Sequence, residues 1–169
     1  EQIEEEQYYL TNNAAEIKEP SKKEIKNVIK VYVALKEIIK NYGLTSISIR
    51  CFDLVTDLKT TGCFALSKLN DEGIIGGCEG DLVSTLGMLW ANYLTEQTVW
   101  MANPSQLDEP NNSVCLAHCT VPLSMTENYK LRSHFESGLG VGIAGEFSKG
   151  KVTILRIGGK NLEKIWISN

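Results

Sequence analysis

Two carboxylates separated by a single glycine stand where an enzyme site is expected. Glu79 and Asp81 follow the apolar pair Ile74-Ile75 and a glycine-rich turn, and Asp81 opens a segment with helical periodicity. This order places both acids at the carboxyl end of a parallel strand, where open α/β sheets bind ligands. Both could bind one divalent cation, or one could hold the metal while the other transfers a proton. The alternative is that Asp81 only caps the helix and Glu79 is solvated.

A histidine flanked by cysteines raises the question of a zinc site. Residues 114–120 have the pattern of a strand, and successive side chains of a strand point to opposite faces. Cys115 and Cys119 then lie on one face and His118 on the other, so the three cannot share one ion locally. We interpret His118 as a hydrogen-bonded structural residue, with a ligand role as the alternative.

A second histidine lies at the end of an expected strand, just before glycines that leave room beside the backbone. His134 has an imidazole that suits first-row divalent metals and would complement Glu79 and Asp81. Arg132 and Glu136 share its face if the strand continues. The alternative is a surface histidine in a hairpin.

Residues 140–145 match a dinucleotide-binding fingerprint in amino-acid sequence, but not in the secondary structure expected around it. That motif needs a strand before it and a helix after it, so that pyrophosphate meets a helix N-terminus. Residues 146–157 continue instead as hairpin and strand. We therefore expect no nucleotide site.

The elements that must position these side chains alternate between helix and strand in the first part of the chain. Ser21 and Glu24 form a capping-box pair, and apolar residues then recur at helical spacing as far as Gly43. Further elements are expected as strands at 46–51, 74–75 and 98–101, a short helix at 62–70 and a second strong helix from Asp81. The alternation predicts a parallel α/β sheet with flanking helices.

The second part lacks helical periodicity and is predicted to be antiparallel β. Strands are expected at residues 113–120, 129–135, 139–147, 151–157 and 162–168. A turn-rich stretch at 103–112 suggests a boundary. The predicted organisation is an acidic N-terminal arm (1–20, a short helix or disordered), an α/β domain (21–112) and an incomplete β-rich domain (113–169).

The amino-acid composition and net charge limit the kinds of molecule that this protein is expected to bind. The 169 residues are 43% hydrophobic and 22% charged, with a formal net charge of -4. No basic field would attract nucleic acid, and no apolar run is long enough to span a membrane. Five cysteines cannot all pair within one chain and sit among apolar residues, which indicates free thiols in a reducing, cytoplasmic setting. A small-molecule or protein partner fits best.

The order of the motifs resembles the L-fucose isomerase-like and L-arabinose isomerase family. The resemblance lies in residues 67–74, Cys78-Glu79-Gly80-Asp81 before a Leu- and Met-bearing helix, Leu116-Ala117-His118-Cys119, and 133–138. It covers most of the chain from about Pro20 onward. Each motif is weak alone, and the ordered set carries the resemblance.

This resemblance implies a metal-dependent aldose-ketose isomerisation, usually with manganese, through an enediolate. It implies that Glu79 and Asp81 are the acids nearest the active site and that His134 is a metal ligand. His118 and Arg132 would lie in the second layer of side chains around these residues. It further implies a small sugar substrate and a homo-oligomer.

Two departures from the family keep a second reading open. Family members are longer, so this chain is expected to be a fragment, and Ala102-Asn103 stands where arabinose isomerases carry an acid. A non-catalytic carbohydrate-binding or assembly module on the same scaffold is therefore the alternative.

Overall fold

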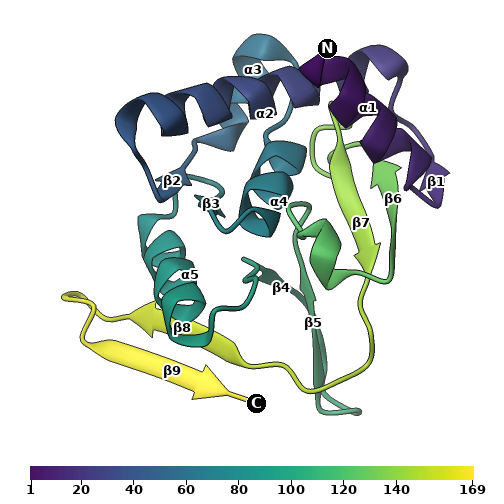
Figure 1. The fold of residues 1–169 in the computed structure, drawn as a ribbon. Coiled ribbons are helices and arrows are strands. Elements are labelled where there is room, and N and C mark those ends of the chain that lie inside the picture. Colours follow the sequence, from purple (N-terminus) through teal and green to yellow (C-terminus); the bar gives the residue numbers. More distant parts are fainter.

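The fold combines helices with four small sheets. The computed structural model describes residues 1–169 (Figure 1). Its helices are α1 (Gln2–Asn12), α2 (Lys22–Tyr42), α3 (Cys51–Leu58), α4 (Cys63–Asp71) and α5 (Leu82–Thr95), with a short 3-10 helix, η1 (Leu123–Met125). Its strands are β1 (Glu16–Ile17), β2 (Ser46–Ser48), β3 (Ile75–Gly77), β4 (Asn103–Asp108), β5 (Ser113–Ala117), β6 (Asn128–Arg132), β7 (Gly142–Glu146), β8 (Ile154–Gly158) and β9 (Lys164–Ser168).

The predicted fold class is confirmed. Strands β2 and β3 pair in parallel, and helices flank them. From β4 onward the pairs β4-β5, β6-β7 and β8-β9 are all antiparallel. Strand β1 joins β6 in parallel, so the N-terminal segment is bound to the β-rich part of the chain.

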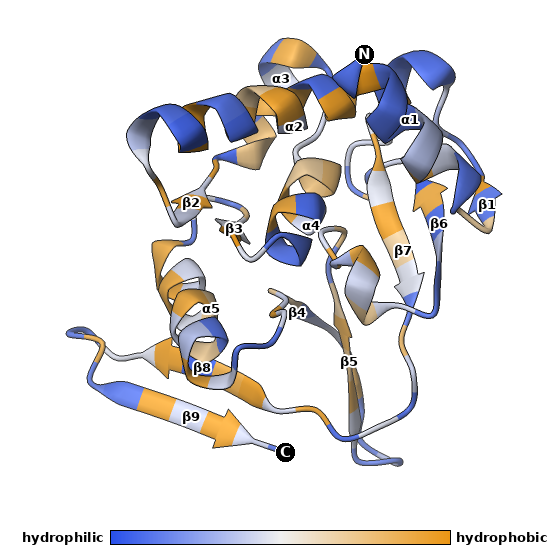
Figure 2. Ribbon diagram, in the orientation of Figure 1, coloured by the Kyte–Doolittle hydropathy of each residue, from blue (hydrophilic) through white to orange (hydrophobic).

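Helix α2 begins and ends where its sequence signals predict. The Ser21 hydroxyl accepts a hydrogen bond from the Glu24 amide at 3.3 Å, and the Glu24 carboxylate accepts one from the Ser21 amide at 2.8 Å. At the other end Gly43 has a φ of 61°, the left-handed conformation that favours glycine. Figure 2 shows hydrophilic and hydrophobic residues alternating along this helix, as its amphipathic pattern requires.

The first twenty residues, which the sequence left open between a helix and a disordered arm, form a helix and a short strand. Leu10 of α1 is fully buried, and its carbonyl oxygen accepts a hydrogen bond from the Tyr129 hydroxyl at 3.0 Å. Burial of this leucine anchors α1 against α2 and the β6-β7 pair.

Some expectations for local structure were wrong. Residues 98–101 form no strand, the strand expected at 46–51 ends at Ser48, and Cys51 already belongs to α3. The stretch from Asn103 to Asp108, expected as turns, is strand β4. Pro104 contributed to the turn prediction, because proline is common in turns. Proline is also tolerated in an edge strand, which has a partner strand on one side only. Strand β4 is such a strand, since it pairs only with β5.

The buried side chains gather in two clusters on either side of α4. The larger one has 15 residues and joins α1, α2, α4, β6 and β7. The smaller one contains Cys51, Leu66, Ile75, Cys78, Met88 and Met101. Buried Asn70 ties α4 to β3, because its amide nitrogen donates to the Gly76 carbonyl at 3.1 Å and its oxygen accepts from the Gly76 amide at 3.0 Å. Helix α4 is thus the central support of the fold.

Candidate functional site

The turn that carries the two acids is held in a strained and well-anchored conformation. Glu79 has a φ of 61° and Gly80 a φ of 66°, so two consecutive residues are left-handed. The Gly80 amide donates to the Ile49 carbonyl at 2.9 Å, which fixes the turn against the end of β2. A non-glycine residue in this region is uncommon and costs free energy, and such residues cluster at functional sites.

Glu79 faces His118. Its Oε1 lies 3.6 Å from the His118 Nε2, and the side chains are 39% and 4% exposed respectively. The His118 Nδ1 lies 2.9 Å from the Thr120 hydroxyl, which orients the ring. The result is a buried imidazole behind a carboxylate that is open to solvent, an arrangement suited to proton transfer.

The surroundings of His118 favour its charged form. Burial acts against that form, but a hydrogen bond and the negative charge of Cys119, and then the charge of Glu79, outweigh it and raise the pKa of His118 above 6.5. The imidazole can therefore serve as a hydrogen-bond donor beside the Glu79 carboxylate.

Asp81 is the N-cap of α5. Its Oδ1 accepts from the Ser84 amide at 2.8 Å, its Oδ2 accepts from the Ser84 hydroxyl at 2.7 Å, and Arg156 lies 3.6 Å away. Burial alone would raise the pKa of this carboxyl, but the Ser84 hydrogen bonds and Arg156 lower it below 3.8. The capping role that the sequence allowed is confirmed.

Replacing Asp81 by alanine is expected to destabilise the protein by about 1 kcal/mol, because the Ser84 amide loses its partner. Asparagine caps helices as well as aspartate does, so Asp81→Asn should stay within about 0.5 kcal/mol of wild type. Urea unfolding of both variants measures the difference. Equal losses in the two variants would show that charge, and not capping, is what Asp81 supplies.

His134 is buried, 6% exposed, and does not lie on the surface of a hairpin. Its Nδ1 lies 3.1 Å from the Ser137 hydroxyl, and its Nε2 lies 3.8 Å from a carboxylate oxygen of Glu136. Its ring also meets Cys63 and Cys119, and the ligand atoms of these three residues all lie within 4.8 Å of one another.

Four cysteines form two close sulfur pairs, and the Cys63–Cys119 pair lies beside this histidine. Cys63 and Cys119 have their sulfurs 3.2 Å apart, and Cys78 donates to Cys51 at 3.0 Å. A hydrogen bond from Cys63, followed by those from the two histidines, lowers the pKa of Cys119 to about 3. A hydrogen bond from Cys78 lowers the pKa of Cys51 to about 7. These hydrogen bonds therefore favour the thiolate form of Cys119 and of Cys51 over that of their partners.

The structure does not bring the predicted metal set together. The ligand atoms of Glu79, Asp81 and His134 do not all lie within 4.8 Å of one another. The Asp81 carboxylate accepts a hydrogen bond from the Ser84 amide, and Arg132 forms an ion pair with Glu19 at 2.8 Å. Within this chain these residues do not fit a shared manganese ion, and the set of three remains a prediction.

Cys63 and Cys119 are the site residues that sequence reasoning missed. The strand was expected to run through Thr120, but β5 ends at Ala117, so strand alternation says nothing about Cys119. Its partner Cys63 is 56 positions away in the chain. Cys63 and Cys119 come together only through the packing of α4, so the local sequence around either residue could not have predicted the contact.

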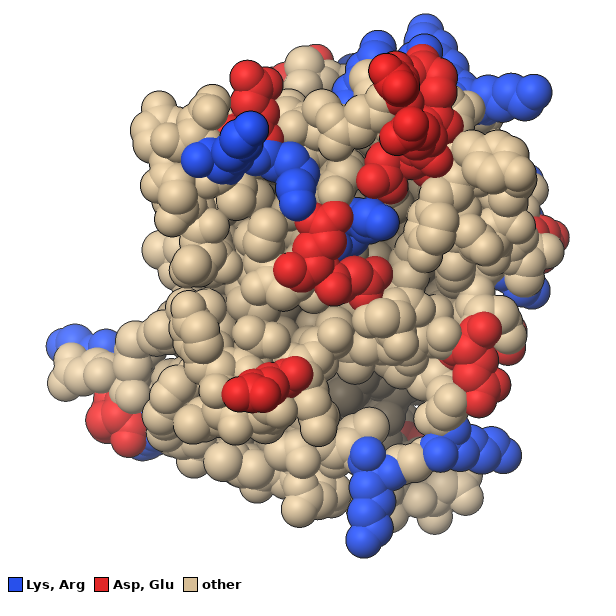
Figure 3. Space-filling view, viewed as in Figure 1, with Lys and Arg blue, Asp and Glu red and all other residues tan.

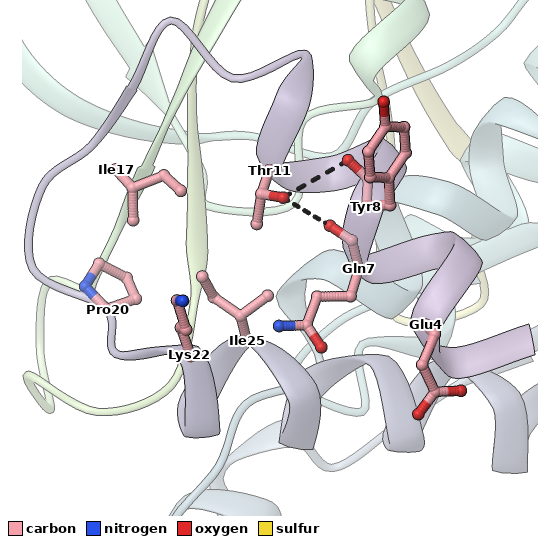
Figure 4. Close-up of a pocket in the computed structure, with 8 residues that line it drawn as sticks. All are labelled: Glu4, Gln7, Tyr8, Thr11, Ile17, Pro20, Lys22 and Ile25. Carbon is pink, nitrogen blue, oxygen red and sulfur yellow. Dashed lines mark hydrogen bonds between the residues drawn. The ribbon is translucent and has the colours of Figure 1, made fainter. Parts of the chain in front are cut away.

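A surface pocket lies away from this site, between α1, β1 and the start of α2 (Figure 4). The Thr11 hydroxyl in it donates to the Gln7 carbonyl at 2.9 Å, and so serves its own helix. Glu4 at its rim forms an ion pair with Lys26 at 3.2 Å. The pocket brings together no group of side chains suited to catalysis.

Charges on the face shown in Figure 3 are mixed, with basic and acidic side chains lying close to one another. This face has no continuous basic field of the kind that binds nucleic acid. Among the helices, none is long and apolar enough to cross a membrane.

Sequence comparison finds similar proteins among sugar isomerases. A protein named sulfoquinovose isomerase from Clostridium sp. (strain MSTE9) is 33% identical over 92 residues, which are 54% of this chain and 21% of the relative. One of the same name from Alkalicoccus urumqiensis is 30% identical over 88 residues, 51% of this chain and 20% of the relative. A third, from Priestia aryabhattai, is 25% identical over 129 residues, 73% of this chain and 29% of the relative.

The similarity is to sugar isomerases. Its aligned parts span about a fifth of the length of the first two relatives, at 21% and 20%. No family model and no solved structure matches the chain. The relatives thus support the sugar isomerase family that the ordered motifs suggested.

Proposed function

We propose that this chain forms part of a sugar aldose-ketose isomerase of the L-fucose/L-arabinose isomerase type. The observation that carries the proposal is the Glu79-His118 pair, with 3.6 Å between the carboxylate oxygen and the imidazole nitrogen. Glu79 follows the carboxyl end of β3 in the parallel β2-β3 pair, where α/β sheets bind ligands, and His118 follows the antiparallel strand β5. Relatives named as sugar isomerases support it independently.

Isomerisation of an aldose to a ketose moves one proton from C2 to C1 and, in balance, one proton from the C2 hydroxyl to the carbonyl oxygen of C1. The Glu79 carboxylate would take the proton from the carbon beside the carbonyl and return it to the former carbonyl carbon. His118, with its raised pKa, would donate a hydrogen bond to the oxygen on which negative charge develops. Thr120 keeps the ring in place, 2.9 Å from its Nδ1.

The relatives suggest sulfoquinovose as the first substrate to test. The full-length protein, incubated with sulfoquinovose, is expected to form the corresponding ketose, detected by NMR. L-fucose, L-arabinose and other aldoses serve as comparison substrates. Absence of any ketose from all of them, with the protein folded, would reject the proposal.

Manganese remains a prediction from the family resemblance, and the roles of Glu79 and His118 are assigned without it. A bound divalent ion would hold the sugar oxygens and stabilise the enediolate. Chelator treatment of the active full-length protein tests this requirement. Sugar binding that persists in chelator without turnover would favour the alternative of a non-catalytic carbohydrate-binding module. The absence of an acid at Ala102-Asn103 is the sequence feature that supports this alternative.

Assembly into a homo-oligomer and a cytoplasmic location also remain predictions. Helix α5 exposes large apolar side chains, with Leu82 72% and Leu94 68% accessible, and such surfaces mark contacts between proteins. All five cysteines are free, as a reducing compartment requires. Light scattering on the full-length protein would measure the number of subunits.

A further inference from the structure

We propose that Cys63, Cys119 and His134 bind one divalent ion of the zinc class, at a site that adjoins the Glu79-His118 pair but shares no ligand with it. Their two sulfurs and a ring nitrogen lie within 4.8 Å of one another. Thiolate and imidazole are the ligands that zinc prefers, whereas manganese prefers oxygen. The proposal does not depend on the proposed isomerase activity, because it rests on three side chains to which no step of that reaction was given.

Three separate segments supply the ligands. Cys63 is the first residue of α4, Cys119 follows β5 by two residues, and His134 follows β6 by two residues. Only the tertiary fold brings them together, so a bound ion would cross-link the α/β part to the β-rich part. A metal that binds the folded state alone adds its binding free energy to stability.

Buried hydrogen bonds hold these segments before any ion binds. The Thr61 hydroxyl, two positions before Cys63, donates to the Val141 carbonyl at 2.9 Å and accepts from the Val141 amide at 3.0 Å. The Ser67 hydroxyl donates to the Val121 carbonyl at 2.6 Å, two positions after Cys119. The site is thus preorganised, which lowers the cost of binding.

The backbone on both sides of the remaining ligands is equally fixed. The Cys119 carbonyl accepts from the Ile143 amide at 3.0 Å, and the His134 amide donates to the Leu139 carbonyl at 3.0 Å. A side chain at Gly142 would begin only 3.2 Å from the Cys119 Cβ, so strand β7 closes tightly on the cysteine. The Ser137 hydroxyl, 3.1 Å from the His134 Nδ1, orients the ring as partners of metal-binding histidines do.

The sulfur spacing, which fits a hydrogen bond between the two thiols, lies close to the spacing that a shared ion needs. Zinc-sulfur bonds of about 2.3 Å at a tetrahedral angle place two sulfurs about 3.8 Å apart. Cys63 and Cys119 are 3.2 Å apart, so an outward shift of about half an ångström would accommodate the ion, whereas a disulfide would need an S–S separation of about 2.0 Å. Cys119 is partly exposed, which gives the ion a way in.

Cobalt(II) is the probe for this site, because thiolate ligands give it a charge-transfer absorption that oxygen ligands do not. The reduced full-length protein is expected to bind one equivalent with this absorption, and zinc should displace it. Cys63→Ser, Cys119→Ser and His134→Ala should each weaken binding by at least roughly tenfold. Cys115→Ser is the matched control, since Cys115 is exposed and outside the cluster, and should bind as wild type does.

A second measurement keeps the proposal testable if a variant does not fold. In the wild-type protein, zinc should protect Cys63 and Cys119 from alkylation, read by mass spectrometry, and leave Cys115 reactive. Three results would overturn the proposal: no thiolate absorption, absorption unchanged in Cys119→Ser, or a Cys63–Cys119 disulfide in freshly reduced protein that excludes the ion. Manganese gives no such absorption, so failure of the isomerase assay and failure of this one are distinguishable.

Discussion

Glu79→Gln in the full-length protein is expected to lower kcat for aldose-ketose conversion by about 10² to 10⁴-fold, the range that a positioned general base contributes. Glutamine keeps the shape and the polar contact with His118, whose Nε2 lies 3.6 Å from the carboxylate, but it cannot accept the substrate proton. The loss should appear in kcat more than in KM, because the carboxylate acts on the reacting carbon and not on the rest of the sugar.

Glu96→Gln provides the matched control. Glu96 is also a glutamate in the left-handed region, with a φ of 55° against 61° for Glu79, but it ends α5 away from His118. Its replacement should leave kcat within about twofold of wild type, and both variants should keep the circular dichroism spectrum of the parent. A Glu79→Gln protein that turns over as fast as the Glu96→Gln protein would remove Glu79 from the reaction.

The ends of α2 and the start of α5 could be predicted because their signals are local, whereas α3 was not predicted at all. The capping box at Ser21 and Glu24 lies within one turn, and Asp81 caps its helix through Ser84 three residues on. Strands in the second part were found for a similar reason, since alternation is visible in a few residues. Strand ends were less certain, as the strand expected through Thr120 shows, because where pairing stops depends on the partner strand.

The predicted site could be recovered only in part. Glu79 does lie at the end of a parallel strand, as its position after the apolar run indicated, and His118 meets it. His134 pairs instead with cysteines, and Asp81 turns its carboxylate to its own helix. Spacing along the chain shows which residues follow a strand, but it cannot show which loops from different strands converge.

The thiol cluster shows this limit most clearly. Free buried cysteines are common and usually inert, so five of them among apolar residues give no reason to group two. Cys63 meets Cys119 because α4 packs against the segments that precede β6 and β7. That contact comes from the whole core and has no counterpart in the local sequence.

The same dependence on α4 leads to the largest expected change in stability. Phe64→Ala should lower the free energy of unfolding by about 3 to 5 kcal/mol, because it removes a fully buried ring and leaves a cavity. The ring packs edge-on against Tyr32 of α2 with 5.9 Å between centroids, so alanine also loses this aromatic contact. Domains are stable by only about 5 to 15 kcal/mol, so the variant should unfold at much lower urea concentration.

Phe135→Ala makes the same chemical change at a side chain that is 79% exposed, and should alter stability by no more than about 0.5 kcal/mol. Equal losses in the two variants would mean that burial in the α2-α4 core is not what Phe64 contributes. Phe64 directly follows Cys63 in α4, so its loss should also loosen the first turn of that helix. Cobalt binding by a Phe64→Ala protein that is still folded should therefore weaken as well, because one ligand of the thiol cluster depends on the helix that the phenylalanine holds in place.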